Sequence, residues 1–186
     1  MAPLTHPTPE LVDSSFAHVL LANGPDVERA SKLALYSWIV GRWDIDVATI
    51  LEDGTMHRGR GEIHAGWVLQ GRAIQDVWMI PRLRDRRPGI EMLPGAGNWY
   101  GTTLRTYDPE LDAWRIIWSD PATNFFTQQI GRAQGPDIVQ TGADPRGGSM
   151  RWIFSEIQPD SFHWTGERAA DDQNWRLEVD IRARRA

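Results

Sequence analysis

The segment GRWDIDVATILEDG, residues 41–54, decides the fold. In it Trp43, Ile45 and Val47 alternate with charged residues, and Asp53-Gly54 ends the run. Alternation with a period of two indicates a strand with one buried and one solvated face. Asp-Gly favours a tight hairpin because both residues tolerate a positive φ. The segment therefore predicts a strand over 42–51 that turns directly into the next one.

The same pattern continues to the end of the chain. In the last segment Trp175, Leu177, Val179 and Ile181 alternate with charged residues, and short turns separate every run from the next. Short connections favour strands that pair in sequence order, and closure removes the exposed edges of such a sheet. We expect an all-β fold, a closed up-and-down antiparallel β-barrel of about ten strands. The predicted strands are 42–51, 57–68, 72–80, 99–107, 112–119, 123–133, 137–142, 149–158, 161–168 and 174–184.

Residues 1–40 differ from the rest and predict a loose leader over 1–9 and short helices over 10–22 and 26–40, the second with Asp26 as its N-cap. We expect these helices to pack on a barrel formed by 41–186, within a single domain. The segment 81–98 contains three prolines and four arginines and predicts a long loop that acts as a lid.

Gly41-Arg42-Trp43 on the first strand and Arg184 near the end of the last one resemble the calycin superfamily. The run from Gly61 to Trp78 resembles the second hairpin of lipocalin-like bacterial barrels of unassigned function, and about ten strands resemble the fatty-acid-binding and nitrobindin-like shape. The resemblance implies that Trp43 and Arg184 meet at the closed end of the barrel as structural plugs. The glycine-rich haem-site pattern of nitrobindins is missing, so the resemblance does not imply haem.

Composition restricts the partners. The chain has 186 residues, a net charge of −5 and no cysteine. An acidic balance argues against nucleic acid and anionic membranes as partners, and the lack of cysteine excludes disulfides and cysteine zinc sites. The N-terminus does not resemble a secretory signal and no apolar run is long enough for a membrane span, so we expect a cytoplasmic protein. Ten tryptophans spread along the chain predict a wide aromatic interior.

Hairpin register points to one set of candidate catalytic residues. If Asp53-Gly54 is a two-residue turn, Glu52 pairs with Thr55, which places Trp43 opposite His64 and Ile45 opposite Glu62. A three-residue turn over 69–71 then places His64 opposite Asp76. In this register His64 and Asp76 form a His–carboxylate pair in the cavity, with Glu62 as a second proton-transfer group.

Apolarity favours the opposite register. Ile63, Ala65, Trp67 and Leu69 form the more apolar face of the second strand and would normally point inward, leaving His64 and Asp76 as a surface pair. A glycine bulge could switch between the two, and the sequence is compatible with both. The run Arg105-Thr106-Tyr107 is similar to the Arg-X-Tyr that holds a fatty carboxylate in intracellular lipid-binding barrels, but it lies mid-chain on an unrelated strand. Arg105 is therefore interpreted as a surface arginine beside a turn tyrosine.

We expect the barrel to bind a small apolar or aromatic metabolite. The alternative is a cofactor-independent enzyme, a lyase, isomerase or hydratase, with His64 as base, Asp76 orienting it and Glu62 as acid. A third hypothesis is an oligomerisation or interaction module, such as a homodimer, with Trp67 or Trp99 on an outer face. No cofactor and no metal are expected, because zinc and non-haem iron usually require two imidazoles. The candidate ligand-binding residues are Trp78, Tyr100, Trp118, Gln129, Trp152, Phe154 and Trp164.

Overall fold

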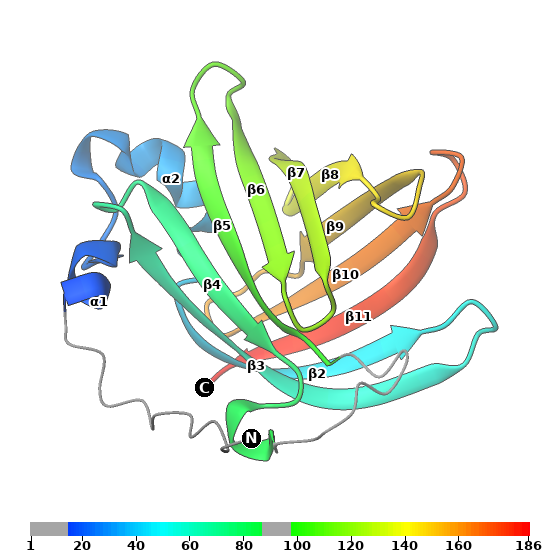
Figure 1. Ribbon diagram of the computed structural model, residues 1–186. Coiled ribbons are helices and arrows are strands. Elements are labelled where there is room, and N and C mark those ends of the chain that lie inside the picture. The colour runs from blue at the N-terminus through cyan, green and yellow to red at the C-terminus, as the bar shows by residue number, and fades with distance from the viewer. Residues whose placement is uncertain (1–14, 87–97) are drawn as a thin grey trace, which may run out of the picture.

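The chain forms a closed antiparallel β-barrel, as the computed structural model shows for residues 15–86 and 98–186. Ten long strands wrap around one interior in sequence order, each hydrogen-bonded to the next (Figure 1). They are β2 (Gly41–Ile50), β3 (Met56–Val68), β4 (Ala73–Met79), β5 (Tyr100–Asp108), β6 (Ala113–Asp120), β7 (Phe125–Gln134), β8 (Asp137–Ala143), β9 (Ser149–Ser155), β10 (Ser161–Ala169) and β11 (Arg176–Arg185). The predicted fold class is confirmed.

The barrel closes where the last of these strands pairs with the first. Strand β11 pairs with β2, with Ile181 opposite Val47, and β3 pairs with both β2 and β4. The two-residue strand β1 (Leu21–Ala22) pairs with Trp67 and Val68 of β3, beyond the point where β2 begins. The last residues of the predicted first helix therefore belong to the sheet.

The N-terminal helices are shorter than predicted. They are α1 (Ser15–Leu20) and α2 (Ala30–Ser37), with a 3-10 turn η1 (Val27–Arg29) before α2. The Asp26 side chain accepts a hydrogen bond from the Glu28 amide at 3.0 Å, so it caps η1 as expected of that residue. The predicted leader over 1–9 and the start of the first helix lie outside the described residues.

Helix α2 lies at one end of the barrel, beside the β3–β4 and β5–β6 turns (Figure 1). Lys32 forms an ion pair of 3.0 Å with Asp112 in the β5–β6 turn. The Tyr36 side chain points down into the barrel, where it is fully buried against Trp114 and Phe154. The helix therefore closes this end.

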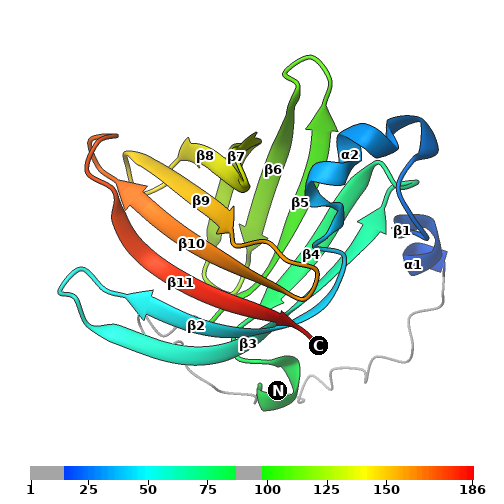
Figure 2. The ribbon, with the colours of Figure 1, turned by 180° about the vertical axis from the view of Figure 1, so that it is seen from behind.

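Trp43 and an arginine complete the closed end, but the arginine is Arg185 and not the predicted Arg184. The Trp43 indole is fully buried and donates to the Ile39 carbonyl at 2.7 Å. The Arg185 guanidinium lies 3.8 Å from the centre of the Trp43 ring and donates to the carbonyls of Trp38 and Val40. Figure 2 shows the end of β11 beside the chain that leads from α2 into β2.

The register of the first hairpin differs from the predicted one by one residue. Leu51 pairs with Thr55, and the three residues 52–54 form the turn, with Gly54 at a φ of +84°. Trp43 therefore lies opposite Ile63, and not opposite His64. In the next hairpin Val68 pairs with Ala73, which places His64 opposite Val77. Both predicted pairings were wrong because the turns are one residue longer than assumed.

The segment after β4 contains a short 3-10 turn, η2 (Leu83–Asp85). Most of the predicted lid, residues 87–97, lies outside the described residues. No helix among the described residues is long and apolar enough to cross a lipid bilayer.

Candidate ligand-binding site

A cavity of about 560 Å³ occupies the barrel between its middle and the end opposite α2. Its rim consists of residues from the turns at that end, among them Glu52, Thr123, Arg146 and Arg176. A ten-stranded barrel is too wide for its side chains to fill, whereas an eight-stranded one is nearly filled. The hollow thus follows from strand number, and it has the size of a typical small-molecule site.

Five tryptophans line the cavity: Trp78, Trp99, Trp118, Trp152 and Trp164. Four of them form a continuous ring of contacts, with centroid distances of 6.1 Å (Trp99–Trp118), 6.2 Å (Trp118–Trp152), 5.7 Å (Trp152–Trp164) and 6.2 Å (Trp99–Trp164). These are tilted or edge-to-face arrangements, in which the indoles support one another. The wall of the cavity is therefore aromatic and held in place by its own packing.

Two glycines make room for these indoles. A Cβ atom at Gly101 would lie 2.5 Å from Cζ2 of Trp118, and one at Gly166 would lie 2.9 Å from Cη2 of Trp164. Each glycine thus lets a ring lie against the wall of the barrel, which leaves the centre open.

A buried ion pair lies at the inner end of the cavity. Asp76 on β4 and Arg105 on β5 face inward, each 1% exposed, and one Asp76 oxygen accepts from the Arg105 guanidinium. The other Asp76 oxygen accepts from the Trp78 indole at 2.8 Å. Burial lowers the pKa of Arg105 to about 10. The interpretation of Arg105 as a surface residue was wrong.

A second polar contact lies between this ion pair and the closed end of the barrel. The Gln140 amide donates to the Tyr36 hydroxyl at 3.0 Å, and the Arg105 guanidinium lies 5.5 Å from the centre of the Tyr36 ring. Burial raises the pKa of Tyr36 to about 12. The phenol therefore stays neutral at ordinary pH, and its ring helps to close this end of the barrel.

Asp120, at the end of β6, is a second buried carboxylate in the cavity wall. One of its oxygens accepts from the Ala122 amide at 2.9 Å and from the Tyr100 amide at 3.4 Å, while the other has no hydrogen-bond donor in residues 15–86 and 98–186. Asp120 was not among the predicted site residues, because the predicted strand over 112–119 ends just before it. The alternation Trp114, Ile116, Trp118 places residue 120 on the inward face and could have identified it.

Ion pairs connect side chains at and beside the rim of the cavity. Asp144 pairs with Arg146 at 2.8 Å and with Arg168 at 3.0 Å, and Arg146 also pairs with Glu178 at 2.8 Å. Burial favours a higher pKa for Asp144, but hydrogen bonds from the Arg146 side chain and backbone outweigh it and hold the pKa below its usual value. These ion pairs hold the charged side chains around the opening in place and balance their charges.

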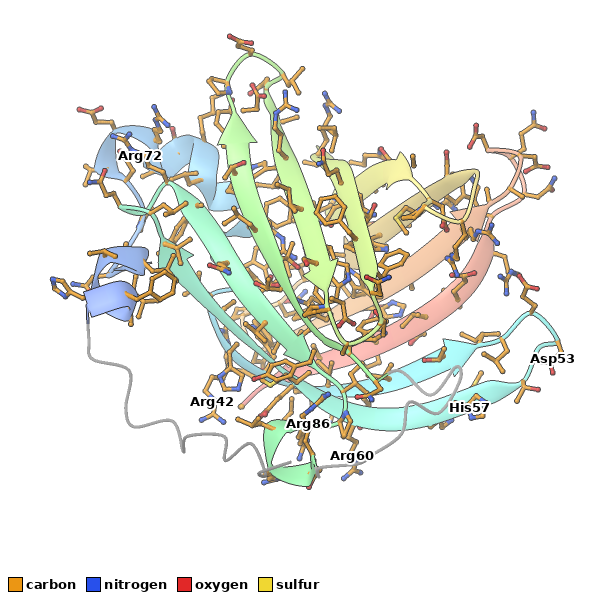
Figure 3. The ribbon with its side chains drawn as sticks, viewed as in Figure 1. Arg42, Asp53, His57, Arg60, Arg72 and Arg86 are labelled. Carbon is orange, nitrogen blue, oxygen red and sulfur yellow. The ribbon has the colours of Figure 1, made fainter. Side chains whose placement is uncertain are left out.

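The predicted catalytic residues are divided between the two faces of the barrel. Glu62 and His64 lie on the outer face, where His64 Nε2 is 3.5 Å from a Glu62 oxygen. Burial opposes ionisation of Glu62, but the Leu83 amide and His64 lower its pKa overall. Arg42, which pairs with His64 across the β2–β3 ladder, also points away from the interior (Figure 3). Asp76 points inward and lies opposite Ala65.

Four of the seven predicted ligand-binding residues border the cavity. Trp78, Trp118, Trp152 and Trp164 line the cavity. Gln129 and Phe154 are buried inside the barrel but do not border the cavity, and Tyr100 lies on the outer face, 44% exposed, against Arg86.

The interaction-module hypothesis required Trp67 or Trp99 on an outer face, and neither residue lies there. Trp67 belongs to the buried core and Trp99 borders the cavity. Within residues 15–86 and 98–186, no group of three or more His, Asp or Glu side chains could hold a metal ion.

No protein-family model matches this chain, and no curated protein matches it. Solved structures do. The chain is similar to Rv2717c from M. tuberculosis, with 13% identity over 89% of this chain and 99% of that one and a TM-score of 0.58. It is also similar to the S-type phycobiliprotein lyase CPES from Guillardia theta, with 11% identity over 87% and 98% of the two chains and a TM-score of 0.54. At these identities the likeness concerns the fold alone, which is that of a lipocalin-like barrel.

Proposed function

We propose that this barrel binds a small, flat, largely apolar molecule in the cavity between Glu52 and Arg105. The ring of tryptophans around about 560 Å³ of open space is the observation that carries the proposal. Concave, mostly apolar pockets with a few fixed polar groups are the usual form of small-molecule sites. The indole faces favour an aromatic or conjugated ligand, because offset and edge-to-face ring contacts add to the hydrophobic term.

The site would have to change little when a ligand binds, which supports the proposal. The Trp78 indole is held by its hydrogen bond to Asp76, and Gly101 and Gly166 fix the positions of two further rings. A pre-organised wall loses little side-chain entropy when a ligand enters, so more of the contact energy becomes affinity.

One structural neighbour is, by its name, a phycobiliprotein lyase. The low identity of that match gives no reason to transfer its substrate, so we propose the ligand class from this chain's own residues.

The alternative of a cofactor-independent lyase, isomerase or hydratase gains no support from the geometry. It needs His64 and Asp76 together in the cavity, whereas His64 lies outside the barrel and Asp76 is held by Arg105 and Trp78. We retain the cavity, and not the His–carboxylate pair, as the functional site.

The test is titration of the protein with flat aromatic compounds of two to four rings, followed by tryptophan fluorescence and calorimetry. Binding at one site per chain is expected. Trp152→Ala removes one wall of the cavity and should weaken binding about tenfold or more. The matched control is Trp175→Ala, because Trp175 packs against Arg151 outside this cavity. Absence of binding across the panel, or equal weakening by both variants, would refute the proposal.

A further inference from the structure

Among the described residues of the cavity wall, one charged side chain has no counter-charge. Seven charged residues of this part of the chain border the cavity: Glu52, Arg105, Asp120, Arg146, Glu167, Arg176 and Glu178. Six of them form ion pairs with other side chains of the described chain. Asp120 forms none among the described residues, although it is only 1% exposed.

One oxygen of Asp120 has no hydrogen-bond donor among the residues that the structure describes. The other oxygen is held by the backbone amides of Tyr100 and Ala122, which fix the direction of the carboxylate. The free oxygen is itself buried and belongs to a residue that borders the cavity. Buried carboxylates without a partner are unfavourable, so a ligand that brings a positive charge or a strong donor to this point gains affinity.

The aromatic wall favours the same kind of group. Trp118 lies two residues before Asp120 on the inward face of β6, and Phe125 lies opposite Asp120 on β7. Cations are attracted to the faces of tryptophan and phenylalanine rings, and the attraction grows when water is excluded. A protonated nitrogen placed near Asp120 would meet a carboxylate and aromatic rings together.

Arg105 does not cancel this preference. Its guanidinium is already paired with Asp76, so the inner end of the cavity is close to neutral. Its Nε atom also lacks an acceptor in the described part of the chain, which favours a neutral acceptor on the part of the ligand that lies deepest.

We propose, building on the binding function above, that the natural ligand is an aromatic amine whose protonated nitrogen pairs with Asp120 at the outer half of the cavity. The flat apolar part then lies among the tryptophans, and the ammonium group faces the free carboxylate oxygen. This assigns Asp120 as the residue that determines ligand class.

The experiment compares three probes that share one ring system: 2-naphthylmethylamine, 2-naphthylmethanol and 2-naphthoate. Calorimetric titrations of the full chain near neutral pH, where the amine is protonated, give a dissociation constant for each. The amine should bind at least about tenfold more tightly than the alcohol, since charge-assisted hydrogen bonds are about twice as strong as neutral ones. The naphthoate should bind most weakly.

The variant Asp120→Asn separates charge from shape. Asparagine keeps an oxygen for the amides of Tyr100 and Ala122, so the β6–β7 turn should fold unchanged, which circular dichroism and thermal unfolding check. It should remove the advantage of the amine over the alcohol and strengthen naphthoate binding. The control Asp46→Asn removes one negative charge on the outer face, where Asp46 pairs with Arg60, and should change none of the three constants.

The outcomes separate this proposal from the one on which it rests. Amine and alcohol binding equally well in the parent protein would overturn the role of Asp120 while leaving the aromatic cavity as a binding site. A preference for the amine that persists in Asp120→Asn would overturn it as well. If none of the three probes binds at any concentration tested, both proposals fail.

Discussion

The ion pair between Asp76 and Arg105 should contribute strongly to the stability of the barrel. Both side chains are 1% exposed or less, and the pair joins β4 to β5 inside the core. Removing one partner of a buried pair leaves an uncompensated charge and costs about 3–5 kcal/mol. Each kcal/mol shifts the melting temperature of a chain of this size by about 2–4 °C, so Arg105→Met should lower it by roughly 6–20 °C.

The two single variants should not be equally harmful. After Asp76→Asn the guanidinium of Arg105 keeps its contacts with the rings of Tyr36 and Phe154, and asparagine can still accept from Trp78. We therefore expect Asp76→Asn to be the milder change. The double variant should cost less than the sum of the two, with a coupling of about 1–3 kcal/mol, because it leaves no unpaired charge.

Urea unfolding followed by tryptophan fluorescence measures all four proteins, since the tryptophans surround this pair. The reasoning is refuted if Arg105→Met unfolds within about 1 kcal/mol of the parent, or if the effects of the two single changes are additive.

Three further predictions follow from the walls, the rim and the closed end. Gly166→Ala places a methyl group 2.9 Å from Trp164 and should push that indole into the cavity, weakening binding of aromatic probes several-fold in fluorescence titrations. Gly66→Ala, where nothing lies within 4 Å, is the control and should bind like the parent. Arg185→Ala should destabilise the chain by about 1–2 kcal/mol in urea unfolding, whereas Arg184→Ala should change it by less than about 0.5 kcal/mol; equal effects would contradict the assignment of Arg185 to the closed end. Because the folded-state pKa of Asp144 lies below its usual 3.8, its contribution to stability is present above that value and is lost as the pH falls through the folded-state pKa. The urea concentration at the midpoint of unfolding should therefore fall less steeply with decreasing pH in Asp144→Asn than in the parent protein. An equally steep fall in both proteins would show that the ion pairs of Asp144 do not stabilise the fold.

Strand positions could be predicted from the sequence because a half-buried strand imposes a period of two on its residues. The segments around Trp43 and Val179 carry this pattern clearly, and turn residues mark where each strand ends. The tryptophan-lined interior followed from the same pattern, which places Trp78, Trp118, Trp152 and Trp164 on the inward face.

The register of the first two hairpins could not be predicted from the sequence. Asp53-Gly54 occurs in two-residue turns and also at the end of three-residue turns with a positive φ at glycine, and the structure has the latter. One residue of difference moved Glu62 and His64 to the outer face. The alternation along β11, in which Val179, Ile181 and Ala183 are buried, places Arg185, and not Arg184, over Trp43.

Charged residues inside the barrel were the hardest to foresee. Pattern reasoning assigns charges to the solvated face, so it placed Arg105 outside and did not consider Asp120. A buried charge is tolerated only where a partner or a ligand compensates it, and that partner lies on another strand. Arg105 and Asp76 are 29 residues apart, and only the pairing of β4 with β5 brings them together.

The two-residue strand β1 gives the N-terminal segment a role in the integrity of the sheet. Where β2 has not yet begun, Trp67 and Val68 would present unpaired backbone groups along one side, and Leu21 and Ala22 pair with them instead. An uncovered stretch of this kind is a template for joining another chain. The segment before α2 therefore covers backbone groups of β3 that would otherwise be open to pairing with another chain.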